Sequence, residues 1–262
     1  MLLLLLLALA VRLWADNTTV RAREYDVSSA KIPAGFEGFR IAQISDLHGN
    51  ERLYPQLLKA VKDAGPDIIV LTGDIADSED QWPALGALLK ELSFAPLYYV
   101  SGNHEWADLR AEAFFRNLGE SGVTLLRNEW LTLEKGGDRL MLAGIEDPNG
   151  YADMPAPAEV ITDIRQGYDG YLVTLCHRPE LFPTLASAGA DLVLSGHHHG
   201  GLIRLPLLGG LVSPAGFFPE YDAGLFTLGE SVLLVSPGLS GAENIPRLFN
   251  RPEVCVAVLH SA

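Results

Sequence analysis

Apolar runs of strand length recur along the chain from residue 39 onward, and stretches with helical spacing separate the first of them. The apolar runs predict strands at 39–45, 67–72, 97–100, 140–145, 171–175, 191–194, 232–235 and 254–259. Apolar positions with a helical period predict helices at 54–64 and 82–92, and Gly65-Pro66 is a stop signal for the first helix. Strands separated by helices at this spacing indicate βαβ units and a partly parallel sheet, so the expected fold class is α/β.

The start of the chain is strongly apolar through Trp14 and is interrupted only by Arg12. We expect an apolar segment at 1–15, a polar connector with a lead-in strand at 16–38, and a single domain at 39–262. The segment is shorter than the roughly 20 residues that span a bilayer, and no basic residue precedes it. It fits an uncleaved membrane anchor, a signal peptide or a helix packed on the body. We favour the anchor, because Arg12 can extend its charge to the membrane surface and Trp14 suits that depth.

The chain is acidic, with 19 Lys and Arg against 33 Asp and Glu and a formal charge of −14. This balance argues against a nucleic-acid-binding surface, because phosphate backbones recruit basic side chains. A metal site can still accept a phosphate, since bound cations offset nearby carboxylates. The only cysteines, Cys176 and Cys255, lie far apart in the sequence and are interpreted as buried thiols, with no disulfide framework.

Five short segments carry residue types that bind divalent metals, and four of them follow an apolar run. In chain order they are Asp46-Leu47-His48, Gly73-Asp74, Gly102-Asn103-His104-Glu105, Cys176-His177 and Gly196-His197-His198-His199. They supply carboxylates, an amide oxygen and imidazoles, and ligands of parallel sheets bind beyond the carboxyl ends of the strands, where these segments fall. Taken singly, Asp46 and Asp74 are equally well explained as helix caps. His48 and His104, taken singly, are equally well explained as exposed turn residues.

A two-metal site suits phosphoester hydrolysis, because two ions activate a water and neutralise the phosphoryl oxygens. Asp46 and His48 alternate on a segment that we expect to be extended, so their side chains should face the same side. Asp74, which follows a glycine, is the natural bridge between the two ions. Asn103 offers a neutral oxygen, which limits the negative charge around an incoming phosphate.

The chain resembles the calcineurin-like metallophosphoesterases over about residues 39–259. The resemblance rests on the ordered motifs Asp46-x-His48, Gly73-Asp74-x-x-Asp77, Gly102-Asn103-His104-Glu105, His177 and Gly196-His197-x-His199. Further details resemble a membrane-anchored bacterial branch that includes proteins likened to a phosphodiesterase of the bacterial envelope: Ser45-Asp46-Leu47-His48, Gly200-Gly201 and Arg247-Leu248-Phe249-Asn250-Arg251-Pro252-Glu253. The resemblance implies a four-layer α-β-β-α fold with a dinuclear site between two sheets. It also implies association with a bacterial inner membrane, with a secreted or periplasmic form after signal cleavage as the alternative.

Carried onto this chain, the resemblance implies one metal held by Asp46, His48 and His199, a second held by Asn103, His177 and His197, and Asp74 as the bridge. His104 would lie outside the metal shell and stabilise the phosphoryl charge or protonate the leaving oxygen. Asp77 would orient His104, although a carboxylate at a helix start is an equal interpretation. One departure is His198, where the anchored branch usually has threonine. On an extended segment His198 points away from its neighbours, so we interpret it as a packing or substrate-side residue.

The mixed ligands suit two divalent ions of manganese, iron or zinc. We expect a phosphorylated small-molecule or lipid-linked substrate, namely a phosphodiester or pyrophosphate in a membrane amphiphile such as the UDP-2,3-diacylglucosamine of lipid A synthesis. A soluble nucleotide or generic phosphodiester is the alternative. A non-catalytic scaffold with this fold is a third hypothesis, which we disfavour because no ligand is missing. No pattern in the sequence indicates an oligomeric state.

A Gly/Pro/aromatic segment at 204–225 follows the last histidine motif and has no helical pattern. It is interpreted either as a functional loop at the mouth of the site or as a surface connector whose aromatics pack down. As a mouth loop, its residues Phe217, Phe218 and Tyr221 could accept an acyl chain. The cations considered for a substrate phosphate are Arg178, Arg204 and Arg247.

Overall fold

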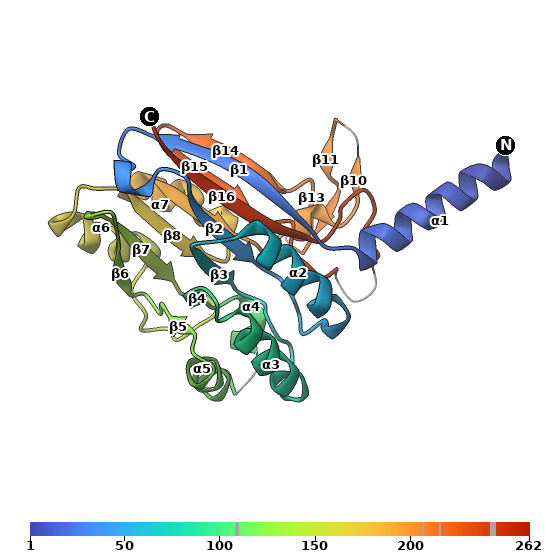
Figure 1. Ribbon diagram of the computed structural model, residues 1–262, viewed down its shortest axis with the longest axis horizontal. Helices are drawn as coiled ribbons and strands as arrows, with labels where there is room; N and C mark the ends of the chain where they lie inside the picture. Colours follow the sequence, from blue (N-terminus) through green and yellow to red (C-terminus); the bar gives the residue numbers. More distant parts are fainter. Residues whose placement is uncertain (108–109, 206, 215, 242–244) are drawn as a thin grey trace.

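The structure, a computed structural model, describes residues 1–107, 110–205, 207–214, 216–241 and 245–262. Two six-stranded sheets pack face to face and carry helices on their outer surfaces (Figure 1). In spatial order the first sheet contains β1 (Arg21–Ser29), β16 (Glu253–Ser261), β2 (Phe39–Ile44), β3 (Ile68–Thr72), β4 (Leu97–Val100) and β5 (Thr124–Leu125). The second contains β14 (Gly224–Leu228), β15 (Ser231–Val235), β9 (Leu192–Ser195), β8 (Leu172–Cys176), β7 (Asp138–Ile145) and β6 (Trp130–Lys135).

The central strands of both sheets are parallel. In the first sheet β2, β3, β4 and β5 run in one direction, and in the second β7, β8, β9 and β15 do so. Every strand predicted from an apolar run is present, with small shifts at its ends. The predicted partly parallel α/β arrangement is therefore confirmed, and it brings the carboxyl ends of neighbouring strands to a common edge.

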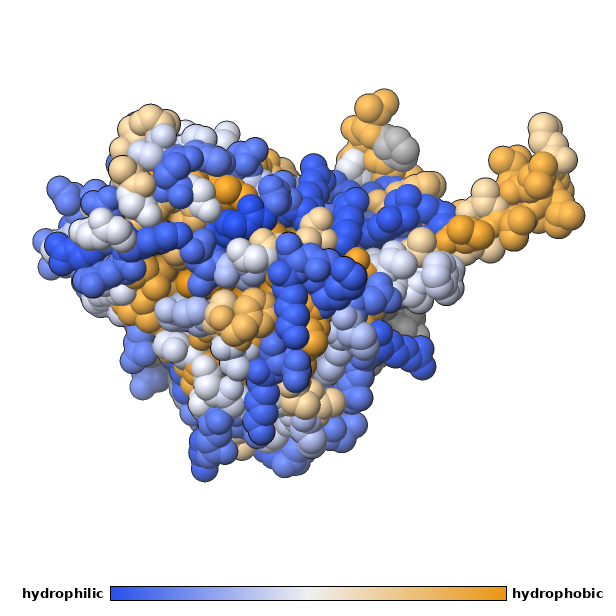
Figure 2. All heavy atoms as spheres, viewed as in Figure 1, coloured by the Kyte–Doolittle hydropathy of each residue, from blue (hydrophilic) through white to orange (hydrophobic). Residues whose placement is uncertain are grey.

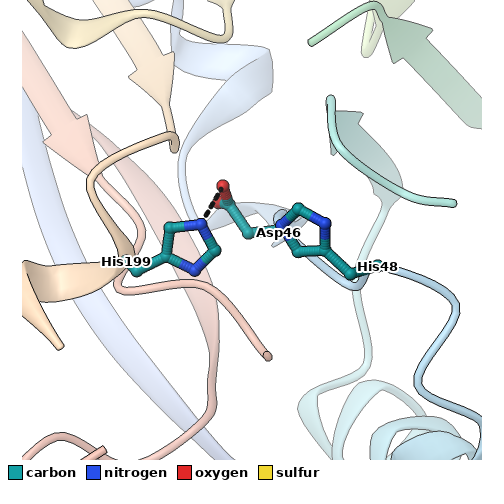
Figure 3. Close-up of side chains that lie close together, drawn as sticks. All are labelled: Asp46, His48 and His199. Carbon is teal, nitrogen blue, oxygen red and sulfur yellow. Dashed lines mark ion pairs between the residues drawn. The ribbon is translucent and has the colours of Figure 1, made fainter. Parts of the chain in front are cut away.

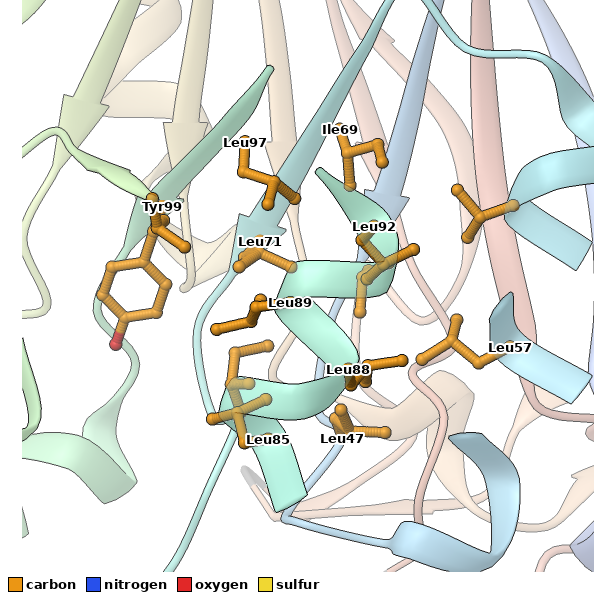
Figure 4. Close-up of a cluster of buried hydrophobic side chains, with 14 of the residues drawn as sticks. Leu47, Leu57, Ile69, Leu71, Leu85, Leu88, Leu89, Leu92, Leu97 and Tyr99 are labelled. Atoms are coloured by element: carbon orange, nitrogen blue, oxygen red, sulfur yellow. The ribbon is translucent and has the colours of Figure 1, made fainter. Parts of the chain in front are cut away.

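Helices cover the outer faces of the two sheets. α2 (Tyr54–Ala64), α3 (Trp82–Leu92) and α5 (Ala111–Glu120) lie on the first sheet, and α6 (Pro157–Gly167) and α7 (Phe182–Ala188) lie on the second. α2 and α3 have the predicted bounds, and Gly65 ends α2 in the left-handed conformation that favours glycine at this position. The apolar stripe of α3 (Leu85, Leu88, Leu89 and Leu92) faces Ile69, Leu71 and Leu97 of the first sheet (Figure 4).

Three buried apolar clusters separate the layers. One lies between the two sheets and contains Ile41 and Val70 from the first with Val173 from the second. The other two lie beneath the helices, one on the outer face of each sheet. The predicted four-layer α-β-β-α architecture is therefore confirmed.

The segment at 16–38 contributes a strand to the first sheet, whereas its first three residues end the N-terminal helix. β1, the expected lead-in strand, pairs in parallel with β16 from Arg21 opposite Glu253 to Ser29 opposite Ser261. Tyr25 is buried in the cluster between the sheets and donates to the Glu253 carboxylate at 2.6 Å. The sequence of β1 is largely polar and does not mark it as a sheet strand, because the outward-facing residues of an edge strand contact water.

The apolar N-terminal segment forms a helix, α1 (Leu2–Thr18), that projects from the body (Figure 1). Each of residues 2–7 keeps 55–78% of its surface exposed, and Figure 2 shows them as an apolar projection. The first turns of α1 are therefore not packed on the body, which removes one of the three interpretations. Among the described residues, no helix is long and apolar enough to cross a membrane.

The segment at 204–225 forms two short hairpins, β10 (Arg204–Leu205) with β11 (Gly209–Gly210) and β12 (Val212–Ser213) with β13 (Gly216–Phe217). Pro206 and Ala215 lie outside the described residues. Phe217 and Phe218 are exposed, whereas the ring of Tyr221 packs edge-on against two other aromatic rings. The packing of Tyr221 agrees with the connector interpretation, and the interpretation as a functional mouth loop stays a prediction.

Candidate metal centre

The predicted metal ligands lie in loops at the carboxyl ends of strands from both sheets. Asp46 and His48 follow β2, Asp74 follows β3, Asn103 follows β4 and begins the short helix α4 (Asn103–Ala107), His177 follows β8, and His197 and His199 follow β9. The loops from the two sheets meet, because the sheets pack face to face with these strand ends on the same side. The site thus lies between the sheets, as expected.

One ligand group consists of Asp46, His48 and His199, whose candidate ligand atoms lie within 4.8 Å of one another (Figure 3). His199 Nε2 is 3.6 Å from Asp46 Oδ1, and the rings of His48 and His199 are stacked at 5.2 Å. His199 Nδ1 lies 2.9 Å from the carbonyl oxygen of Ser240, so its Nε2 is the nitrogen that faces Asp46. These residues are the set that the resemblance assigns to the first metal.

A second group consists of Asp74, His177 and His197, again within 4.8 Å. His177 Nε2 lies 3.3 Å from Asp74 Oδ2, 3.2 Å from Asn103 Oδ1 and 3.2 Å from His197 Nδ1. His177 Nδ1 is held by the carbonyl oxygen of Thr72 at 2.8 Å, which orients the ring. The bridging role of Asp74 stays a prediction, because its carboxylate lies with the second group only.

The donor atoms of both groups fit divalent cations. His48 Nε2 is buried and has no hydrogen-bond partner among the described residues, as expected of a metal-ligating nitrogen. Burial lowers the pKa of both His197 and His199 to about 4, so at neutral pH each imidazole is uncharged and keeps a lone pair. Burial disfavours the charged form of His177, but Asp74 outweighs it and raises the pKa of His177 to about 10, so this imidazole would release a proton on binding a cation. Carboxylates, imidazoles and an amide oxygen are the ligands that manganese, iron and zinc share.

Many ligand residues adopt left-handed backbone conformations that non-glycine residues rarely use. The φ angles are 52° for Asp46, 48° for His48, 52° for Asp74, 69° for His197 and 50° for His199. The expectation that Asp46 and His48 converge by alternation along an extended segment was therefore wrong in its reason, although the side chains do converge. Such backbone strain persists only where surrounding contacts impose it, and it concentrates at functional sites.

Two glycines leave space for the carboxylates. A Cβ on Gly102 would lie 2.2 Å from Asp74 Oδ1, and a Cβ on Gly196 would lie 2.4 Å from Asp46 Oδ2. Both distances are far inside van der Waals contact. Any side chain at these positions would therefore displace the carboxylate of a predicted metal ligand.

Asp77 lies between His48 and His104. Its Oδ1 is 2.7 Å from His48 Nδ1 and 2.9 Å from His104 Nδ1. The hydrogen bond to Asp77 raises the pKa of His104 to about 9, so this imidazole is protonated at neutral pH. His104 Nε2 lies 4.0 Å from Asp74 Oδ2, and the side chain is half exposed, so it stands beside the ligands and faces solvent.

Sequence reasoning assigned no role to Glu105, although this residue belongs to one of the motifs. Its buried carboxylate accepts hydrogen bonds from the backbone N–H groups of Gly102 at 2.7 Å, Asp74 at 3.0 Å and Ile75 at 2.7 Å. It therefore joins the loop after β3 to the loop after β4. A carboxylate beside the histidine was the available signal, but only the fold shows which amides it reaches.

His198 is not on an extended segment, which corrects the reason given for its direction. It has helical angles (φ −85°, ψ −2°) between two left-handed histidines. Its Nδ1 lies 2.7 Å from the carbonyl oxygen of Tyr221, and its Nε2 lies 3.0 Å from Glu180 Oε1. Glu180, His197 and His198 also converge within 4.8 Å. Because both ring nitrogens of His198 have protein partners, the contacts favour the packing interpretation.

The three candidate cations differ in accessibility. Arg247 is fully buried and donates to the carbonyl oxygens of Pro237, Ser240 and Asn250, so it does not reach a substrate and that hypothesis was wrong. Arg178 pairs with Asp147 at 2.7 Å, and Arg204 pairs with Asp222 at 3.0 Å. Both of these side chains are partly exposed.

Cys176 is fully buried beside the site, and burial raises the pKa of its thiol to about 12. A thiol with such a pKa is almost fully protonated at neutral pH and is therefore a poor nucleophile. Cys255 is also buried and free. The interpretation of both residues as buried thiols is confirmed.

A cleft of ≈ 1300 Å³ opens at the first ligand group. His48, His104 and His199 line it together with Asp77. Its wall also includes Asn17, which lies in the last turn of α1, and residues of the hairpin and C-terminal loops. The centre is therefore open to solvent, and its opening lies beside the base of the apolar helix.

Comparison with known proteins shows the family to which the chain belongs. Residues 39–201, which contain every predicted ligand, match the family described as Calcineurin-like phosphoesterase. The uncharacterized metallophosphoesterase YkuE of Bacillus subtilis (strain 168) is 30% identical over 254 residues, which cover 92% of this chain and 86% of that protein. The phosphodiesterase YaeI of Escherichia coli (strain K12) is 29% identical, with 84% of this chain and 82% of that protein covered.

Two further similarities are more limited, one in the share of the relative that is covered and the other in sequence identity. A transmembrane protein with metallophosphoesterase domain from Danio rerio is 28% identical, but the match covers 91% of this chain and only 57% of that protein. The crystal structure of TT1561 of Thermus thermophilus has the same fold, with a TM-score of 0.51 at 16% identity over 76% of this chain and 89% of that one. From the family match, the relatives and the ligand groups together, the chain is a metallophosphoesterase and belongs to the calcineurin-like phosphoesterase family.

Proposed function

We propose that this protein hydrolyses a phosphodiester or pyrophosphate bond with two divalent metal ions. The observation that carries the proposal is the pair of ligand groups, Asp46/His48/His199 and Asp74/His177/His197, beside His104 at an open cleft. When bound, two such ions supply Lewis-acid stabilisation of the phosphoryl oxygens and activate the attacking water. The identity of the ions is left among manganese, iron and zinc, because all three accept these ligands.

The chain's own residues have distinct roles in this proposal. Asp74, whose carboxylate lies with the second group, would also serve as a ligand to the first ion, and Asn103 would add a neutral oxygen to the second group. His104 donates a proton or a hydrogen bond to the leaving oxygen, since it is protonated at neutral pH and half exposed. Asp77 accepts from His104 Nδ1 and so directs Nε2 toward the substrate.

The proposed substrate is an amphiphile at a bacterial inner membrane, of the type of UDP-2,3-diacylglucosamine. The exposed apolar helix α1 and the cleft that reaches its last turn support an anchored enzyme with a lipid-linked substrate. A relative named as a transmembrane protein is compatible with anchoring. The second candidate is a soluble nucleotide or generic phosphodiester, which the relative named as a phosphodiesterase favours. A secreted form and a non-catalytic scaffold remain the lesser alternatives.

The test is metal content by elemental analysis together with manganese-dependent hydrolysis of bis-p-nitrophenyl phosphate and p-nitrophenyl phosphate. We expect about two metals per chain and faster cleavage of the diester. Chelation should abolish cleavage, and manganese should restore it. Absence of stoichiometric metal after reconstitution would refute the proposal, whereas metal binding without cleavage of either compound would favour the scaffold.

Replacing His104 with Asn is expected to lower kcat for the diester by about 10²–10³-fold, because a positioned proton donor contributes on this scale. Metal content should stay at the wild-type value, because the proposal assigns metal to the other two ligand groups and not to the convergence of His48, Asp77 and His104. The matched control is His260→Asn, a histidine on β16 that pairs with Asp26 and Glu37 far from the site. Unchanged kcat in the His104 variant would remove it from the mechanism.

A further inference from the structure

Two apolar projections extend from the same side of the molecule. The first is the exposed part of α1, residues 2–7. The second, here called the leucine hairpin, is the β10–β11 hairpin with Leu205, Leu207 and Leu208 at its tip. In Figure 2 both stand out as apolar protrusions on an otherwise largely hydrophilic face, and in Figure 1 α1 extends to the right while the hairpin points upward near the base of α1.

The α1 projection is apolar around its whole circumference. Consecutive residues of an α-helix point about 100° apart, and residues 2–7 are all leucine. A groove on a protein partner would cover one stripe and leave the other faces exposed. The hydrocarbon interior of a lipid bilayer would surround the helix and cover all of its apolar faces. We therefore favour a lipid bilayer over a protein groove as the partner of α1.

The leucine hairpin has the same character on a smaller scale. Leu207 is fully exposed, Leu208 is 68% exposed, and Phe217 and Phe218 of the adjacent hairpin are 74% and 60% exposed. Large apolar side chains are rarely gathered at a loop tip without a partner. Three arginines belong to the bases of the two projections or pair with one of them: Arg12 of α1 and Arg251 both pair with Asp16, and Arg204 of β10 pairs with Asp222, each side chain being partly exposed. Guanidinium groups at this level suit lipid headgroups.

The base of α1 is attached to the catalytic domain by buried polar contacts. Asn17 makes two hydrogen bonds with the backbone of Arg247, and Asp16, which is completely buried, accepts the N–H of Phe249 at 2.6 Å. Because α1 is fixed to the same loops that line the cleft, its direction relative to the metal ligands is also fixed. The wall of the cleft includes both His199 and Asn17, so the ligand group and the base of α1 border the same opening.

We infer that α1 and the leucine hairpin together form a two-point docking surface for a lipid bilayer. Docking places the mouth of the cleft at the headgroup level, so that a membrane-resident phosphodiester enters with its chain still in the bilayer. The substrate part of this inference rests on the proposed function, whereas the docking part rests on the surface alone. The new element is the second contact, the hairpin, which sets the orientation of the cleft above the membrane.

The experiment measures co-sedimentation of the full chain with phosphatidylcholine vesicles in low and high salt. The double variant Leu207→Glu/Leu208→Glu is expected to bind at least about tenfold more weakly than the wild type, because two apolar side chains no longer enter the bilayer. Binding should persist in high salt, since apolar burial is not screened. The matched control is Phe94→Glu, an exposed apolar residue that follows α3 and belongs to neither projection.

Hydrolysis is measured in parallel on two diesters, soluble bis-p-nitrophenyl phosphate and hexadecyl p-nitrophenyl phosphate embedded in the vesicles. The hairpin variant should keep wild-type activity on the soluble diester and lose at least about tenfold on the embedded one. Equal vesicle binding by the hairpin variant and the wild type would overturn the two-point surface. Binding that requires anionic lipid and disappears in salt would overturn it as well. Vesicle binding without hydrolysis of either diester would contradict the proposed function while supporting the docking surface.

Discussion

Asp74→Asn is expected to lower kcat/KM for bis-p-nitrophenyl phosphate by about 10³-fold or more, a loss of about 4 kcal/mol of transition-state stabilisation. Asparagine keeps the shape of the side chain but lacks the charge that offsets two cations. The Asp74 carboxylate is buried, lies 3.3 Å from His177 Nε2 and accepts the backbone N–H of His104 at 2.9 Å. Burial alone raises the pKa of Asp74, but His177 outweighs it and holds that pKa well below its usual range, so the charge is present at neutral pH.

The measurements are steady-state kinetics and metal content of the same preparations. Metal should fall below two per chain in the variant, because the proposed bridge carries less charge. The matched control is Asp63→Asn on α2, an exposed carboxylate paired with Lys59. A variant with full metal content and full activity would contradict the bridging assignment, and normal thermal unfolding would show that the loss does not come from misfolding.

Arg247→Gln is expected to lower the free energy of unfolding by about 3–5 kcal/mol. The guanidinium is buried and donates to the carbonyl oxygens of Pro237, Ser240 and Asn250 at 2.5, 2.6 and 2.8 Å. Glutamine is shorter and cannot satisfy all three acceptors, so buried carbonyl groups lose their partners. Ser240 O also holds His199 Nδ1, so the variant should bind the first metal more weakly.

Chemical denaturation of the metal-free protein measures the first effect, and metal titration measures the second. Arg139→Gln, at an exposed arginine of β7, is the matched control and should change stability by less than about 0.5 kcal/mol. Arg247→Lys should also destabilise, since an ammonium lacks the planar fork that serves separate acceptors. A stability change within the control range would show that these hydrogen bonds contribute little.

The sequence predicted the central secondary structure well because buried parallel strands are apolar along their whole length. Runs such as 68–72 are unambiguous, and α2 and α3 carry both an apolar stripe and a defined stop or start. The edge strands β5, β6 and β14 were not predicted. Their faces alternate or contact water, so no continuous apolar run marks them.

The ligand types were likewise determined by the sequence, since few other chemistries need aspartate, asparagine and histidine at successive strand ends. The spacing of Asp46 and His48 by two residues kept them near each other, but the left-handed backbone that makes their side chains converge is imposed by the fold. Only the tertiary structure brought His199 to Asp46 and His177 to Asp74. The hydrogen bond from the His197 N–H to the Asp46 carboxylate, for example, joins residues that are 151 positions apart in the sequence. The left-handed backbone at the ligands also depends on the fold, because an isolated chain avoids that conformation.

The tertiary structure decided the contacts of buried polar residues that the sequence could not predict. Arg247, Glu105 and His198 are polar residues with no local signal for whether they face substrate, backbone or solvent. The fold surrounds Arg247 with carbonyl groups, places Glu105 over three amide N–H groups, and sets His198 between Glu180 and Tyr221. The sequence by itself thus determined the layers and the metal chemistry through apolar runs and ligand types. The packing of distant loops decided which polar groups meet, because hydrogen bonds form between neighbours in space whatever their separation along the chain.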